Sequence, residues 1–545
     1  MSVVKLPDTI TVSPSQVRDT AARIGISVPN SEDVDAYCIL ISGLDACVAL
    51  IDAEDDYVPH LDLQRFPRVD IHRPTAAENA AEYNAWAYKV QIVSTSPADR
   101  VGPLAGVSVA IKDTVNIGGV PSLLGTDVFS KPFVPAYDAT IVTRILQAGG
   151  TIVGKAACEN FSVAPTSFTN AHANVQNPLA PGYSAGGSSS GSGALLCAGT
   201  VRVAIGGDQG GSIRLPASYC GLVGLKPTFG LVPYTGIASL SAIIDHTGPM
   251  SRTVLDNALL LNAIAGKDGL DDRQIDAPAH GAVDYYTPLL AYQSDPKAAV
   301  KGLRIGLLIE SLTFAGLDPR VVDKVKEAAN LFRALGAEVV DVSIPMHELG
   351  GAIWTVANRQ AISEQALRAQ NPRLGVHDVA LNQELSTWTQ DKFDKLQRHN
   401  PAATNAFLGG QYLKDKYPGM TDKAINLSRK LKDAYQAVFT NEGIDLLILP
   451  CTPTIANYTS SASDGLMDKM AKTIGITQNT APFNVSGHPA LSLPIGILSV
   501  IEPGREADAH LKLPVGLQIV GGLFNESLIY RAAFAWEQSY NWRQL

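Results

Sequence analysis

One segment of the chain has the pattern of a strand, a helix and a second strand in succession. Residues 303–309 form a short apolar run, and residues 338–342 form another. Between them, Asp318 and Pro319 are typical of a helix start, and Gly336 is typical of a helix end. The inward positions of this helix are Val322, Val325, Ala329 and Phe332. Because strands joined by a helix pair in parallel through a right-handed crossover, the chain is predicted to be an α/β protein.

Further short apolar runs extend this sheet along the chain. A run at residues 107–111 is followed by an amphipathic helix at 138–147 and a run at 151–153. Later runs at 445–450 and 513–521 precede a closing helix at 526–539. We therefore expect a large, mixed and mostly parallel central sheet that is flanked by helices.

Two regions of the chain have a helical pattern instead. Residues 1–85 carry Ala-rich amphipathic runs separated by Pro59 and Pro67, and are predicted to be an N-terminal helical region. Residues 86–545 are predicted to form the main domain. Within it, residues from about 345 to 440 are rich in Gln, Lys and Asn at helical spacing, which indicates an inserted helical subdomain or lid.

The composition favours a packed globular protein without a membrane segment. The chain is 46% hydrophobic and 17% charged, which is too apolar for disorder. Its most apolar early window, residues 36–50, is interrupted by Asp45, and we find no uninterrupted apolar run of 18 residues. The first twenty residues show neither a basic nor an apolar signal region. We expect no membrane partner and a cytoplasmic location.

The charge of the chain and the spacing of its cysteines and histidines limit the classes of ligand that we expect it to bind. The net charge of −9 and the absence of Lys/Arg-dense stretches argue against nucleic acid. The six cysteines contain no CxxC pair, which fits a reducing compartment. The ten histidines show no HExxH or HxH spacing, so we expect no metal and no cofactor. A small-molecule partner is favoured.

Residues 184–216 concentrate glycine and serine. Ser188 and Ser212 lie 24 residues apart, and each directly follows a Gly-Gly pair. Such loops present backbone N–H groups and hydroxyls to a small ligand, because glycine has no side chain to block them. A flexible linker has a similar composition, but residues 200–205 alternate like a half-buried strand. We interpret the stretch as a reaction site.

A nucleophilic serine needs a base and donors for the oxyanion that it creates. The N–H groups from Gln209 to Ser212 are expected to converge at a helix start, which makes Ser212 the candidate nucleophile. The nearest histidines, His172 and His246, fit ordinary polar packing. Lys112 ends a predicted apolar strand, where burial would lower its pKa and leave a neutral amine that accepts a proton.

From about residue 75 to the C-terminus, the chain resembles the amidase signature family. The motifs that carry the resemblance are AIKDT around Lys112, GGSSSGSGA from Gly186, GGDQGGSIRLPASYCGLVGLKPT from Gly206, GPMSRT from Gly248, NVSGHPALSLPIG from Asn484 and LPVGLQIVG from Leu513. The resemblance implies the amidase signature fold, with residues 86–545 as the catalytic domain. It also implies Lys112 as general base, Ser188 as a bridging serine after a cis peptide bond, and Ser212 as the acyl-forming nucleophile.

The same resemblance implies roles for surrounding positions. These are Gln209, Gly210 and Gly211 as oxyanion-hole amides, Ser162 as a substrate contact, Ser189 as a partner of the lysine, and Asp208 with Arg214 as a structural ion pair. The chain departs from the family pattern at Ser190, which replaces a glycine of GGSSGG and puts the backbone conformation there in question.

The implied activity is hydrolysis of a small carboxylic amide to an acid and ammonia or an amine, through an acyl-enzyme and without a cofactor. Carbamates are a further substrate class under this reading. The helical arm and the insertion favour a stand-alone hydrolase over a component of an amidotransferase. The N-terminal helices offer a surface for a homodimer.

Two other readings of the glycine-rich loops compete with this one. Residues 187–191 also fit GxSxG, so an α/β-hydrolase-type esterase could use Ser189 with an Asp and a His. That reading leaves GGDQGGS unexplained. A kinase-like protein could hold phosphate on the same loops, but no GxxxxGK[ST] occurs.

Overall fold

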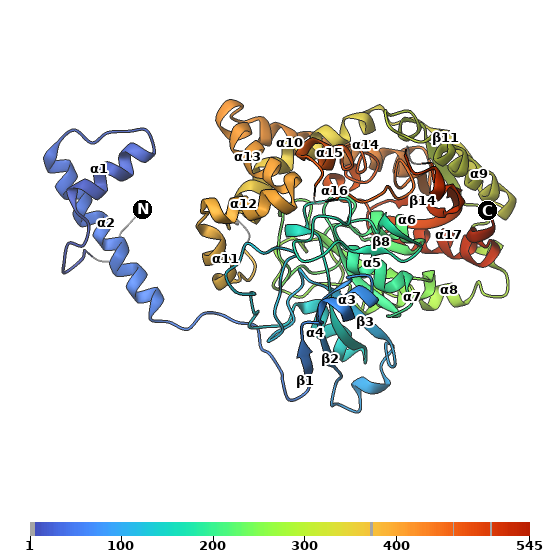
Figure 1. The fold of residues 1–545 in the computed structure, drawn as a ribbon, viewed down its shortest axis with the longest axis horizontal. Helices are drawn as coiled ribbons and strands as arrows, with labels where there is room; N and C mark the ends of the chain where they lie inside the picture. Colours follow the sequence, from blue (N-terminus) through green and yellow to red (C-terminus); the bar gives the residue numbers. More distant parts are fainter. Residues whose placement is uncertain (1–5, 371–373, 462, 502–503) are drawn as a thin grey trace. The chain divides into compact units, whose positions relative to one another are not determined.

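The computed structural model describes residues 6–370, 374–461, 463–501 and 504–545. The chain divides into two compact units, Met1–Pro59 and His60–Leu545 (Figure 1). We describe each unit by itself.

The first unit is a pair of helices, α1 (Pro14–Arg23) and α2 (Ser31–Asp52). Ser13 and Gln16 form a capping box at the start of α1, and the Asn30 side chain caps α2. Val17, Val34 and Cys38 form the small core between them. This core leaves most of α2 uncovered, because a pair of helices can bury only one stripe of each.

Helix α2 corrects the expectation that no segment could span a membrane. Within the described residues it is the one helix long and apolar enough to do so, by length and composition alone, and 22% of its most apolar window is buried. Asp45 interrupts the apolar run in sequence, but the other acidic residues of the helix, Glu32, Asp33, Asp35 and Asp52, lie toward its ends and leave its middle apolar.

The second unit is built on a sheet whose described part has 12 strands. Its strands, in spatial order, are β1 (Arg68–His72), β2 (Trp86–Ile92), β4 (Thr151–Ala156), β3 (Ser108–Lys112), β7 (Val203–Asp208), β9 (His246–Ser251), β8 (Val223–Lys226), β13 (Ala490–Ser499), β14 (Lys512–Gly521), β12 (Leu446–Pro450), β10 (Arg304–Leu308) and β11 (Glu338–Val342). A separate ribbon pairs β5 (Gln176–Asn177) with β6 (Ala180–Ser184).

The sheet is mixed, as predicted, but the expectation that it is mostly parallel is wrong. Parallel pairing is found in two places, β4–β3–β7 and β12–β10–β11, and the other described neighbours are antiparallel. Two consecutive strands can pair in parallel only through a long crossover connection, which is usually an α-helix. The described part of the β13–β14 connection carries only a short 3-10 helix, Glu506–His510, so these two long strands form a hairpin.

The predicted strand–helix–strand unit is confirmed as β10, α9 (Pro319–Leu335) and β11. Asp318 caps the helix by accepting from the Arg320 N–H, and Gly336 ends it with a φ of 103°. Val321 and Val325 are buried, whereas Val322 is only half-buried. Ala329 and Phe332 are buried as well, so the predicted inward face of α9 is confirmed except that Val321 takes the place of Val322.

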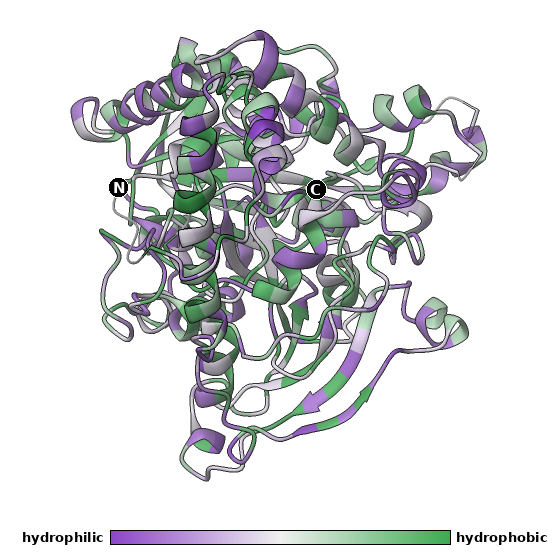
Figure 2. Ribbon diagram, turned by 90° about the vertical axis from the view of Figure 1, so that its left-hand side faces the viewer, coloured by the Kyte–Doolittle hydropathy of each residue, from purple (hydrophilic) through white to green (hydrophobic). Residues whose placement is uncertain are grey.

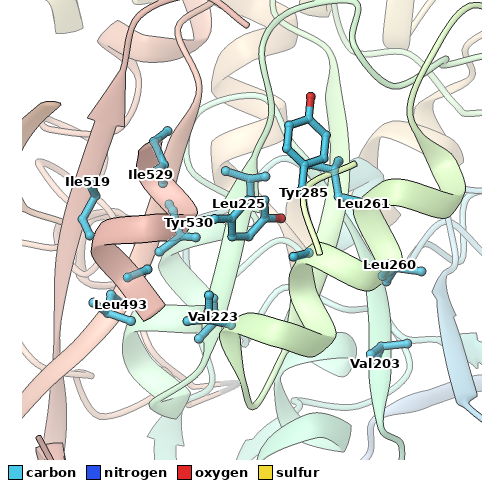
Figure 3. Close-up of a cluster of buried hydrophobic side chains, with 14 of the residues drawn as sticks. Val203, Val223, Leu225, Leu260, Leu261, Tyr285, Leu493, Ile519, Ile529 and Tyr530 are labelled. Carbon is cyan, nitrogen blue, oxygen red and sulfur yellow. The ribbon is translucent and has the colours of Figure 1, made fainter. Parts of the chain in front are cut away.

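Helices cover both faces of the sheet. On β7, Val203 and Ile205 join a core that includes α7 (Val254–Ile264) and α17 (Glu526–Ser539), while Ala204 faces a second core under α5 (Ser190–Cys197) and α6 (Arg214–Cys220). Figure 3 shows part of the first core, with Tyr530 of α17, Leu260 of α7 and the sheet residue Val223 among its members. The remaining α-helices outside the insertion are α3 (Ala76–Ala81), α4 (Thr140–Gln147), α8 (Thr287–Leu290), α15 (Leu466–Ala471) and α16 (Pro482–Ser486).

The boundary predicted at residue 85 is corrected to Pro59. Strand β1 lies inside residues 1–85, which were expected to be helical, and β2 begins directly after them. The two strands pair with each other at one edge of the sheet. Near the end of the predicted helical region, α3 stops at Ala81, and Tyr83 and Asn84 adopt left-handed backbone conformations before β2 begins. Trp86, Ala87 and Val90 then pack as strand residues.

The described part of the region at 345–440 is mainly helical. It contains α10 (Gly350–Ala361), a π-helical turn (Ile362–Ala366), α11 (Val379–Ser386), α12 (Gln390–His399), α13 (Pro401–Lys416) and α14 (Met420–Asn441). Figure 1 shows these helices gathered together, and Figure 2 shows hydrophilic and hydrophobic residues interleaved along the helices. Leu381, Leu396 and Ala406 supply a shared core with Phe161 of the main body.

Candidate active site

Lys112 lies at the end of β3, between β4 and β7, and is fully buried. Its Nζ donates to the Ser188 Oγ at 2.8 Å and to the Gly207 carbonyl at 3.4 Å. Burial lowers the Lys112 pKa to about 8, although nearby acidic groups partly oppose this shift. The expectation of a buried lysine with a lowered pKa is therefore confirmed.

Ser188 lies in a tight turn before α5, and the Gly187–Ser188 peptide bond is cis, as the family resemblance implied. The glycines of this turn are required by space as well as conformation. A Cβ on Gly187 would lie 2.2 Å from the Thr166 carbonyl oxygen. Gly186 has a φ of 75°, and a Cβ there would lie 2.6 Å from the Pro216 Cα.

The hydrogen bonds of the next two residues, Ser189 and Ser190, differ from those that the family resemblance implied. The Ser189 Oγ donates to the Gly207 carbonyl at 3.1 Å and accepts the Gly207 N–H at 3.2 Å. The expected direct bond from Ser189 to Lys112 is therefore replaced by a shared acceptor, Gly207. Ser190 begins α5, and its hydroxyl donates to Glu159 Oε1 at 2.8 Å. Ser190, which replaces a glycine of the family pattern, thus has a hydrogen-bond partner of its own in Glu159.

Ser212 follows β7 on the second glycine-rich loop and is 8% exposed. Its carbonyl accepts the Ser189 N–H at 3.3 Å, so the two serine loops are joined by a hydrogen bond. Gly211 directly before it has a φ of 138°, and a Cβ there would lie 2.5 Å from Thr480 Oγ1. The structure therefore brings Lys112, Ser188 and the Ser212 loop together.

The predicted ion pair of Asp208 and Arg214 braces this loop, and both residues are fully buried. Arg214 donates to Asp208 at 2.8 and 2.9 Å and to the Asn484 Oδ1 at 2.8 Å. Burial alone would raise the Asp208 pKa, but Arg214 and the hydrogen bonds to the carboxylate hold that pKa well below its usual range. Asp208 is therefore ionised at neutral pH.

The predicted oxyanion-hole amides are corrected at one position. The Gly211 N–H donates to Asp208 Oδ1 at 2.8 Å and is not free. Within the described chain, we find no hydrogen-bond acceptor for the N–H groups of Gln209, Gly210 and Ser212. These three amides remain available for a ligand oxygen.

A pocket of about 190 Å³ opens onto Ser212. Ser162, Gln209 and Gly210 lie in its wall, so the predicted substrate contact and two of the free amides face the same space. Phe161 and Ser162 both have left-handed backbone conformations, with φ of 50° and 59°. The Ser162 hydroxyl is buried and has no hydrogen-bond partner among the described residues. Such strained, unsatisfied positions are typical of ligand contacts.

Sequence reasoning missed two groups that hold the site. Trp354 of α10 donates its indole N–H to the Gln209 carbonyl at 2.7 Å, and the Thr480 hydroxyl donates to the Gly210 carbonyl at 2.6 Å. Thr480 lies four residues before the NVSG motif, whose Asn484 also donates to Asp208. No local motif marks Trp354, which reaches the loop from the helical insertion.

The α/β-hydrolase reading finds no matching geometry among the described residues. The Ser189 hydroxyl is bonded to backbone, whereas that reading requires an imidazole at this oxygen. The ring of His246 is buried, and its Nδ1 lies 2.8 Å from the Ile244 carbonyl. The described residues contain no group of three His, Cys, Asp or Glu side chains placed to hold a metal.

Comparison with known proteins decides the family. The Amidase family model matches residues 71–529. The chain belongs to the amidase family. An enantioselective amidase from Rhodococcus rhodochrous is 36% identical over 86% of this amidase and 84% of the relative. The family is one of amide C–N hydrolases, and the Ser-cisSer-Lys triad is its hallmark.

Other proteins similar to this chain are components of amidotransferases. One component of a glutamyl-tRNA(Gln) amidotransferase, from Trichodesmium erythraeum, is 32% identical over 82% of this amidase and 86% of the relative. The crystal structure of the corresponding amidotransferase component from Thermotoga maritima has a TM-score of 0.65 at 26% identity, covering 84% of this amidase and 88% of that chain. The amidase signature fold is thus shown, while the relatives leave the substrate open.

Proposed function

We propose that Ser212 is the nucleophile, that Ser188 relays its proton, and that Lys112 is the base. The proton of the Ser212 hydroxyl passes to Ser188, whose own proton passes to the neutral Lys112 amine, while the Ser212 Oγ bonds to the amide carbon. The amides of Gln209, Gly210 and Ser212 stabilise the oxyanion. Lys112 returns the proton through Ser188 to the leaving nitrogen as the C–N bond breaks, and water then hydrolyses the acyl-enzyme.

The observation that carries this proposal is the 2.8 Å bond from the Lys112 Nζ to the Ser188 Oγ in a fully buried setting. The test compares Ser212→Ala and Ser189→Ala by ammonia release from simple amides. Ser212→Ala should lose hydrolysis while staying folded, and Ser189→Ala should keep most of it. Retained hydrolysis in Ser212→Ala would refute the nucleophile, and loss only in Ser189→Ala would favour the esterase reading.

We further propose that the substrate is a small amide, with carbamates as a second class. The pocket volume of about 190 Å³ supports a ligand of a few heavy atoms beyond the carbonyl. The 36% identity to an enantioselective amidase supports a stand-alone hydrolase. A panel of aliphatic amides, aryl amides and ethyl carbamate, read by ammonia release from the purified chain alone, tests both points. Activity that appears only with an added protein partner would favour the amidotransferase role.

We also propose that the first unit pairs with a second copy of this chain. Five exposed apolar residues lie along one side of α2 at spacings of three and four, the pattern of a helix-pairing seam: Tyr37, Leu40, Leu44, Val48 and Ile51. Light scattering of the purified protein should give a dimer that Leu44→Glu with Val48→Glu converts to a monomer. Ile275→Glu, an isolated exposed apolar site, is the control. A monomeric wild type, or a protein that requires detergent, would refute the pairing.

The reducing, cytoplasmic setting is likewise a proposal. All six cysteines are free thiols, and four of them are buried. Cell fractionation of the native host tests it, and recovery of the enzyme with membranes would support the membrane reading of α2 instead.

A further inference from the structure

The wall of the active-site pocket contains one charged residue, Arg359, among the described residues that line it. The other lining residues are neutral and mostly small or apolar. We find no carboxylate, hydrogen-bond acceptor or aromatic ring paired with the Arg359 guanidinium in the described part of the chain. Burial lowers its pKa, and no acidic group opposes this shift. Arg359 is thus a partly buried cation without a counter-ion.

The structure holds Arg359 in place beside the nucleophile loop. It lies on α10, four residues after Thr355 and three before Ile362, and all three residues face the pocket. The same helix is attached to the loop through the bond from Trp354 to Gln209. Gly409 of α13 packs beside the side chain, since a Cβ there would be in ordinary van der Waals contact with the Arg359 Cδ, at 3.4 Å. The backbone of Arg359 is therefore fixed relative to the Ser212 loop, and its side chain extends along the pocket wall.

An unpaired cation in a partly buried wall is unfavourable, because burial removes part of its water and no described side chain replaces it. A ligand anion would offset that cost. The planar guanidinium matches a carboxylate with two parallel hydrogen bonds, and such charge-assisted bonds are among the strongest in proteins. The small, largely apolar remainder of the pocket fits a short hydrocarbon spacer between that carboxylate and the amide.

We propose that Arg359 binds a carboxylate carried by the substrate, so that the preferred substrates are small amides with a second, acidic end. This inference rests on the proposed amidase function and deepens it. Arg359 is a specificity-determining residue that acts on the distal end of the substrate. The attacking serine and its base do not depend on it, so neutral amides remain substrates of lower efficiency.

The test compares monoamides of dicarboxylic acids with the neutral diamides of the same acids, over several spacer lengths. Ammonia release gives kcat/KM for the wild type, Arg359→Met, Arg359→Lys and Lys414→Met. Lys414 is the control, because it carries the same charge on α13 and is paired with Glu364 outside the pocket. Thermal unfolding verifies that each variant is folded.

The wild type should favour the acidic monoamide at its best spacer length. Arg359→Met should lower kcat/KM for that substrate by about 10- to 100-fold, mainly through KM, and change the neutral diamide by less than about threefold. Arg359→Lys should recover part of the preference, and Lys414→Met should keep all of it. Equal losses on both substrates, or a wild type without preference, would overturn the inference and leave the amidase function standing. No hydrolysis of either substrate or of the wider amide panel would overturn both.

Discussion

At the scale of single residues, the site depends on a lysine that is kept out of water. An exposed ammonium would be charged at neutral pH and could not accept a proton. Burial at the end of β3 favours the neutral amine, and the pKa near 8 leaves part of the population uncharged at physiological pH. The residue thus combines a structural position, deep between strands, with a chemical role that no surface lysine could fill.

The activity should accordingly rise with pH. Below about 8 Lys112 is mostly the ammonium and cannot take the serine proton, and above it the amine is free, so kcat/KM should increase through an apparent pKa near 8 and then level off. A pH profile between 6 and 10 with a neutral amide measures this. A flat profile, or one that falls above pH 7, would contradict the role of Lys112. Lys414→Met should leave the profile unchanged.

The buried ion pair gives a second prediction at this scale. Asp208→Asn removes the charge opposite Arg214 and should lower the free energy of unfolding by about 3 to 5 kcal/mol, because it leaves a buried guanidinium without its anion. Denaturant unfolding measures the loss. Asp256→Asn breaks the more exposed pair with Arg202 and should cost less than about 1 kcal/mol. Equal effects of the two substitutions would show that the buried pair does not brace the loop.

At the scale of elements, two glycine-rich turns and one distant helix make the site. The turns could be predicted because glycine and serine are concentrated in one short stretch of sequence. The groups that exclude a Cβ at Gly187 and Gly211 belong to Thr166 and Thr480, and only the fold shows them. Helix α10 could not be assigned this way, because Trp354 and Arg359 are significant only through what they approach across the fold. For the same reason, the occupied Gly211 amide could not be anticipated without the position of Asp208.

The contribution of α10 can be isolated with Trp354→Phe. The change keeps an aromatic ring but removes the hydrogen bond to the Gln209 carbonyl, so the loop should be held less firmly and kcat should fall by roughly 5- to 10-fold. Steady-state kinetics measure this fall. Trp388→Phe removes a comparable indole bond to Leu367 within the same helical region but outside the pocket, and kcat should be unaffected. A similar fall in both variants would argue for a general loosening of the insertion.

At the scale of the whole chain, the α/β class and the helical insertion followed from periodicity, whereas strand order did not. Which strands become neighbours depends on long-range pairing, and nothing local in β13 or β14 shows that they form a hairpin. The first boundary was placed too late because Ala-rich residues around α3 look helical in sequence, while the neighbouring β1 becomes a strand only by pairing with β2.

The corrected boundary predicts how the chain tolerates truncation. Removal of residues 1–59 should leave hydrolysis per active site within about twofold and a similar unfolding temperature, because the deleted residues form their own unit. Removal of residues 1–85 deletes β1 and exposes the edge of β2, so it should yield a destabilised or aggregated protein. Thermal unfolding and activity of both truncations decide between the boundaries, and equal behaviour would contradict the division at Pro59.

The hydrogen bond from the Trp354 indole to the nucleophile loop also limits which substitutions can alter the substrate preference of this enzyme. One helix both steadies the attacking machinery and supplies the wall that selects what enters, so mutations that reshape recognition risk disturbing turnover as well. Variation toward new substrates should therefore accumulate one to two turns beyond Trp354, at Arg359 and Ile362, while the tryptophan itself is retained.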